Sequence, residues 1–123
     1  MNEIRRIGPA RAVDTRGTAI RVAVPLNESP SPEWVHFFQD FPKEFTTIAH
    51  PKFVDIELNA LYFTSEQARF AEWLHYIQRW IDDANAKYRE YVEGLRRKQD
   101  EKARAERERQ HLINDATEKL RGL

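Results

Sequence analysis

Two stretches of the chain place a glutamate and a histidine three residues apart, a spacing at which helices present metal ligands. The heptapeptide EWVHFFQ contains Glu33 and His36, and the heptapeptide EWLHYIQ contains Glu72 and His75. In di-iron helical bundles a Glu-x-x-His pair of this kind projects from a helix into the bundle core. The repetition of the pattern raises the question of a duplicated metal or catalytic site.

The helical period argues against a shared ligand site. At about 100° per residue, Glu72 and His75 lie opposite the apolar arc of their own helix, so we expect both to face water. That arc consists of Phe70, Trp73, Leu74, Ile77, Ile81 and Ala84. A buried bundle site would also need carboxylates from two further helices, and the sequence indicates only two helices in all. We therefore predict no metal site and interpret Trp34 and Trp73 as core anchors, each contributing about 2–3 kcal/mol through burial.

No other group of residues predicts catalysis. Ser29, Ser31 and Ser65 occupy loop or helix-cap positions, and the four glycines form no phosphate-binding loop. His50 is expected in a loop, where functional groups concentrate, but its predicted role is that of a polar turn residue. The sequence thus predicts a protein that is not an enzyme and uses no cofactor.

Composition limits the classes of protein to which the chain can belong. Its 123 residues, 41% of them hydrophobic, suffice for one modest domain with an extension. Twenty basic and twenty acidic residues give zero net charge, so no whole-molecule field attracts nucleic acid or a membrane. Cysteine is absent, which excludes disulfides and thiolate chemistry. Because no run of about 18 apolar residues occurs, we expect a soluble cytoplasmic protein with no membrane partner.

Alternating hydrophobicity predicts two β-hairpins. Residues 18–24 alternate as in a half-buried strand, and residues 11–14 can pair with them across a turn that contains Gly17. Residues 52–57 and 60–63 repeat this plan. The side chains expected to face the core are Ile20, Val22, Val24, Val54, Ile56, Leu61 and Phe63.

Each hairpin leads into a helix that carries one of the heptapeptides. Ser31 before Pro32 offers an N-cap and a favoured first helical residue, and Thr64 with Gln67 offers a capping box. Residues 44–49 are a candidate edge strand. The predicted fold class is therefore α+β, with an antiparallel sheet from two hairpins in a ββα-ββα pseudo-repeat and a long C-terminal helix that extends past the sheet.

The C-terminal helix carries an apolar stripe longer than the sheet can cover. Apolar or small residues recur at alternating steps of four and three from Phe70 to Leu95, the heptad spacing of a coiled coil. A sheet of four or five strands is roughly 19–24 Å wide and needs only about 13–16 helical residues to cross it. The side chains predicted to project beyond it, and to form an oligomer interface, are Ala84, Tyr88, Tyr91, Val92 and Leu95.

The uncovered part of the stripe predicts self-association. A second copy of the same helix is the simplest cover, because most soluble oligomers are closed homodimers. We expect a homodimer, with the direction of pairing left open. The alternative cover is the chain's own tail, folded back near Gly94.

The residues beyond the stripe differ in character. Residues 96–109 contain eleven charged side chains in fourteen positions, which is typical of a solvated helix. We therefore divide the chain into an α+β domain at residues 1–95 and a charged helical extension at residues 96–123. A short apolar stripe resumes at Leu112, Ile113, Ala116 and Leu120, which suggests a continued helical pair or a docking helix for another protein.

Two functional classes follow from these features. The favoured one is a non-enzymatic interaction module that pairs through its long helix. The alternative is a nucleic-acid-binding accessory protein whose N-terminal arginines contact phosphates, which requires Arg11 and Arg21 to share the exposed side of the first hairpin. These arginines are Arg5, Arg6, Arg11, Arg16 and Arg21. Seven acidic residues at 25–66, against two lysines, can neutralise that patch.

Overall fold

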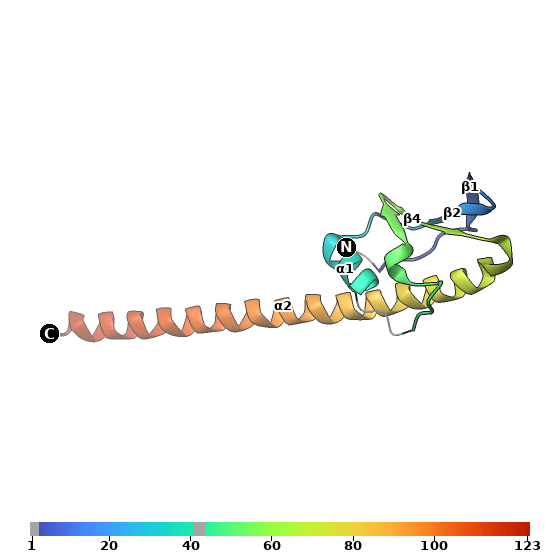
Figure 1. Cartoon of the computed structure of the whole chain (residues 1–123). Helices are drawn as coiled ribbons and strands as arrows, with labels where there is room; N and C mark the ends of the chain where they lie inside the picture. The colour runs from blue at the N-terminus through green and yellow to red at the C-terminus, as the bar shows by residue number, and fades with distance from the viewer. Residues whose placement is uncertain (1–2, 41–43) are drawn as a thin grey trace. The chain divides into compact units, whose positions relative to one another are not determined.

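The computed structural model describes residues 3–40 and 44–123, and its elements are shown in Figure 1. The strands are β1 (Arg11–Arg16), β2 (Ala19–Pro25), β3 (Asp55–Glu57) and β4 (Ala60–Ser65). The helices are α1 (Pro32–Asp40) and α2 (Phe70–Arg121), and the 3₁₀ turns η1 (Pro51–Phe53) and η2 (Gln67–Arg69) precede β3 and α2. The predicted α+β class is confirmed.

The chain divides into two compact units. The N-terminal unit is Met1–Tyr88, which contains the sheet, α1 and the beginning of α2. The helical unit is Arg89–Leu123, which contains the remainder of α2. Across the two described stretches, every helix is either too short or too polar to cross a lipid bilayer.

The two hairpins form one antiparallel sheet with the strand order β1-β2-β4-β3. Each hairpin closes with a two-residue loop, because Arg16 pairs with Ala19 and Glu57 pairs with Ala60. The predicted repeat is visible in the register. Val22 and Phe63 lie at the same distance after their loops, and they are direct partners between the central strands β2 and β4.

The core lies between one face of the sheet and the helices, and in Figure 1 the first part of α2 runs beneath the sheet. Of the sheet residues expected to face this core, those buried are Val22, Val24, Val54, Leu61 and Phe63. Ile20 and Ile56 are partly buried and pack against the same cluster. The alternating pattern therefore identified the inward face of both hairpins correctly, as the period of two along a strand requires.

The two helices differ in how well their starts could be predicted. Ser31 Oγ accepts a hydrogen bond from the N–H of Trp34 at 3.3 Å, which confirms the N-cap of α1. The prediction of a capping box at the second helix is wrong, because Thr64 lies within β4 and pairs with Arg21 of β2. The 3₁₀ turn η2 follows Glu66 instead, and no side chain caps it.

Residues 44–49 do not form the candidate edge strand. Thr46 Oγ1 accepts a hydrogen bond from the N–H of Ala49 at 2.8 Å and closes a local turn. The carbonyl oxygen of Glu44 accepts a bond from Trp80 Nε1 at 2.6 Å. Because these polar groups find partners within the turn and on α2, the segment has no need of a strand partner. The strand predicted at residues 52–57 is likewise shortened to β3, because its first residues belong to η1.

Residues 4–7 complete the N-terminal unit in a way that the sequence did not indicate. Arg6 forms an isolated bridge with Leu26, and the N–H of Ile7 donates to the carbonyl oxygen of Pro25 at 3.1 Å. Ile4 is fully buried, and its backbone bonds to the side chain of Asn85 on α2. The segment thus covers α2 at a point beyond the reach of the predicted sheet.

Candidate functional site

The two heptapeptides bury side chains at equivalent positions. The buried positions are Trp34 and Phe38 in the first and Trp73 and Ile77 in the second. His36 and His75 are exposed at the same position of the two motifs. The interpretation of the tryptophans as core anchors is confirmed.

The glutamates and histidines of these motifs are not gathered into one site. His36 Nδ1 lies 2.6 Å from a carboxylate oxygen of Asp40, one turn along α1. Glu72 lies 3.3 Å from the guanidinium of Arg69. Within residues 3–40 and 44–123, no group of three or more His, Asp or Glu side chains could hold a metal ion.

His50 is the N-cap of η1. Its Nδ1 accepts a hydrogen bond from the N–H of Lys52 at 3.0 Å, and its ring centroid lies 4.5 Å from that of Phe45. Burial lowers the pKa of His50, and the charge of Lys52 lowers it further. Only the neutral ring offers an unprotonated Nδ1, so both effects favour the form that caps the turn.

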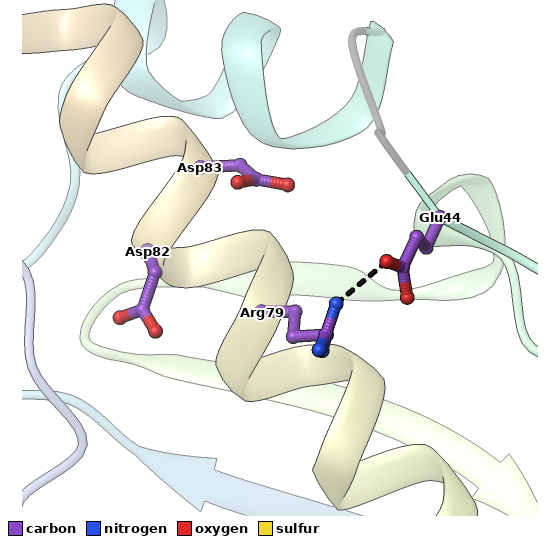
Figure 2. A pocket seen from close by; sticks show the side chains of 4 residues that line it. All are labelled: Glu44, Arg79, Asp82 and Asp83. Carbon is purple, nitrogen blue, oxygen red and sulfur yellow. Dashed lines mark hydrogen bonds and ion pairs between the residues drawn. The ribbon is translucent and has the colours of Figure 1, made fainter.

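A shallow pocket of about 300 Å³ lies beside α2 and is lined by Glu44, Arg79, Asp82 and Asp83. Figure 2 shows Glu44 and Arg79 pointing toward one another, and their charged groups are 2.6 Å apart, whereas Asp82 points away from them. This ion pair, together with the bond from Trp80 to the same residue, ties the loop to the helix. Among the described residues, those that line the pocket carry three carboxylates and a guanidinium, and none carries a hydroxyl, thiol or imidazole.

The N-terminal arginines meet the geometric condition of the nucleic-acid alternative only in part. Arg11 pairs with Ala23, and Arg21 pairs with Asp14. Because paired residues share a face, the register places Arg11, Arg21 and Asp14 on the side of the sheet opposite Val22 and the core. Arg16, paired with Ala19, also belongs to this outer face.

The outer face is not a basic patch. Arg21 is bound 3.0 Å from a carboxylate oxygen of Asp55 and lies 4.7 Å above the ring of Tyr62, with only 16% of its side chain exposed. Asp14, Asp55 and Glu57 balance the three arginines of this face. Arg6 donates from Nε to the carbonyl oxygen of Gly8 at 3.1 Å, and Arg5 is exposed outside the hairpin. A neutral face offers little counterion release to a phosphate backbone.

The predicted interface residues divide into two groups. Ala84 is fully buried in the core of the N-terminal unit and has no surface to offer a partner. Tyr88 is half-buried and packs against the same core. Tyr91, Val92 and Leu95 belong to the helical unit and are exposed by 39%, 44% and 44%. The heptad stripe of α2 is therefore accessible from Tyr91 onward, and we call this accessible part the seam.

The fold-back alternative is wrong. α2 continues without a break from Phe70 to Arg121, so the chain does not reverse at Gly94. Gly94 has open space around the position of a Cβ atom and does not adopt a positive φ. The glycine therefore does not end the helix.

Sequence reasoning missed two polar contacts of the core. Asn85 is 7% exposed, and its Oδ1 accepts hydrogen bonds from the N–H of Ile4 at 3.1 Å and from Trp34 Nε1 at 2.9 Å. Its Nδ2 donates to the carbonyl oxygen of Ile4 at 2.8 Å. Trp80 is 1% exposed, and its polar contact is the bond from Nε1 to the carbonyl oxygen of Glu44. The helical spacing does indicate that both residues face the core, because Asn85 lies one turn after the apolar Ile81 and Trp80 lies two turns after Trp73.

No family model, curated protein or solved structure matches the chain. The accessible seam of α2 combines large apolar side chains, heptad spacing and exposure.

Proposed function

We propose that the protein is a non-enzymatic assembly module that self-associates through its helical unit. The observation that carries this proposal is the exposure of Tyr91, Val92 and Leu95 along one face of α2. Residues three and four positions apart lie side by side on a helix, so the three side chains make a continuous apolar surface. A surface of this kind is typical of a contact with another molecule.

A second copy of the chain is the partner that the helical unit favours. The unit contains ten basic and eight acidic residues, so two copies meet with little net repulsion. It also carries a second exposed apolar group, with Leu112, Ile113 and Leu120 exposed by 67%, 44% and 67%. Two copies can cover both groups at once, whereas an unrelated protein partner would have to supply a matching surface of its own.

The proposal is tested by placing a charge in the seam. In Leu95→Asp, two buried carboxylates would enter each dimer, and we expect the dissociation constant to rise about tenfold or more, because tenfold corresponds to only about 1.4 kcal/mol. Sedimentation equilibrium over a range of concentrations measures this change. The matched control is Ala103→Asp, which places the same charge at an exposed position away from the seam.

The control is expected to retain the dimer mass of the unmodified chain. A monomeric mass for the unmodified chain at every concentration would contradict the proposal. Equal weakening by both substitutions would show that the seam is not the contact.

A further inference from the structure

The heptad positions of the seam continue through the charged part of the helical unit. Steps of three and four from Leu95 lead to Lys98, Lys102, Ala105, Arg109, Leu112 and Ala116. These positions are all helical and exposed. The seam therefore has apolar ends and a basic middle.

The apolar ends form two separate groups. The proximal group is Tyr91, Val92 and Leu95, and the distal group is Leu112, Ile113 and Ala116. Val92 and Ile113 flank the seam at equivalent heptad positions, 21 residues or three heptads apart. Each group by itself is too short for a stable coiled coil, so a stable pair must bury both groups.

We propose that two copies pair antiparallel, with the proximal group of each copy on the distal group of the other. This inference depends on the self-association proposed above. In this register Leu95 faces Leu112 of the second copy, and Val92 faces Ile113. The large ring of Tyr91 faces the small Ala116, a combination that fills the space between facing layers. Both ends of the paired helices are then closed by apolar contacts.

A parallel pair would be opposed by charge. It places each seam residue against its own copy, so Lys98, Lys102 and Arg109 would each face an identical cation at the centre of the interface. Like charges in a partly desolvated interface repel strongly. Two alanines would also meet at Ala116 and leave the interface underpacked there.

The antiparallel register relieves part of this repulsion, because it has two layers of facing cations where the parallel pair has three. Lys102 of each copy faces Ala105 of the other, and the cations that still face one another are Lys98 and Arg109, once in each direction. Arg109 is already paired with Glu106 on its own helix at 3.2 Å, which reduces the charge it presents. The order of charged and apolar positions along the seam therefore favours the antiparallel arrangement.

Cysteine cross-linking tests the direction of pairing, because the chain contains no cysteine of its own. Full-length Leu95→Cys and Leu112→Cys are each oxidised alone and as a mixture in which one variant is ¹⁵N-labelled. A disulfide forms where Cα atoms approach to about 4.4–6.8 Å, the distance expected across facing seam positions. We expect a disulfide-linked dimer of intermediate mass in the mixture and little linkage in either variant alone. Ala103→Cys, at an exposed position off the seam, is the control for random collision and is expected to stay unlinked.

The alternative outcomes are distinguishable. Linkage of Leu95→Cys to itself would overturn the antiparallel inference and establish a parallel pair, leaving the self-association proposal intact. A dimer mass under reducing conditions without linkage in any sample would overturn this register. A monomer mass for all the chains would overturn the proposed function together with the inference.

Discussion

At the scale of single residues, Asn85 is the polar centre of the N-terminal unit. Its side chain joins the N-terminal segment at Ile4, the helix α1 through Trp34, and α2, on which it lies. In the described part of the chain, no buried side-chain nitrogen or oxygen lacks a hydrogen-bond partner. One asparagine thus satisfies three buried polar groups that have no other partner within the helix ladders or the sheet.

Replacing this residue is expected to be costly. Asn85→Ala leaves the N–H and carbonyl of Ile4 and the indole N–H of Trp34 buried without partners, and we expect the free energy of unfolding to fall by about 2–4 kcal/mol. Urea denaturation measures the change. The control is Gln78→Ala on the same helix, where the lost bond to Asp82 is exposed, and its effect is expected to stay within about 0.5 kcal/mol. Equal stabilities for the two variants would contradict the central role of Asn85.

At the scale of elements, the two hairpins share a backbone feature but differ in the residue that adopts it. The first loop residue has a positive φ in both, 64° at Gly17 and 52° at Leu58. Glycine adopts this conformation freely, whereas a leucine is strained in it. Leu58 is 83% exposed, so its side chain gains little from packing. The second hairpin therefore holds strain that the first avoids.

Exchanging the residue types is expected to have opposite effects. Leu58→Gly should raise the free energy of unfolding by about 0.5–1 kcal/mol, because the relief of strain exceeds the added entropy of the unfolded chain. Gly17→Leu should lower it by about 1 kcal/mol or more through strain alone, since no atom lies within 4 Å of the added Cβ. Thermal and urea unfolding of both variants measure the changes. A shift of the same sign in both would refute this account of the loops.

At the scale of the whole molecule, burial and exposure divide the chain at the boundary between its two units. The buried core residues run from Ile4 to Ala84, and Tyr88 is the last residue that packs against them. Residues 96–123 are exposed at every position. Ion pairs with the acid on the N-terminal side support the helical unit, including Glu93 with Arg96 and Glu118 with Arg121. The buried core therefore lies in the N-terminal unit, and the association that we propose would use the helical unit.

A chain ending at Tyr88 is expected to keep the fold and lose the association. All fifteen residues of the buried cluster remain in it, so cooperative unfolding should persist. The exposed seam is removed, so the mass should be that of a monomer. Thermal denaturation followed by circular dichroism and static light scattering measure these two properties. Loss of the cooperative transition would show that the helical unit contributes to the fold, and a persistent dimer would place the contact elsewhere.

The sequence by itself determined the features that have a local period. Alternation identified the inward faces of both hairpins, and the 3.6-residue period separated Trp73 and Ile77 from His75 on one helix. These assignments succeed because side-chain direction follows from backbone geometry within a few residues. The same reasoning identified Tyr91, Val92 and Leu95 as an apolar surface.

Only the tertiary structure decided how far the core extends along α2 and where several backbone groups find their partners. Asn85 is buried where Ile4, 81 residues away in sequence, lies against the helix, and Ala84 belongs to the same core. Thr64 joins β4 rather than capping a helix because β2 is present to pair with it. Contacts between segments so distant in the chain have no period, since they depend on which polar groups and apolar surfaces the folded elements leave unmatched.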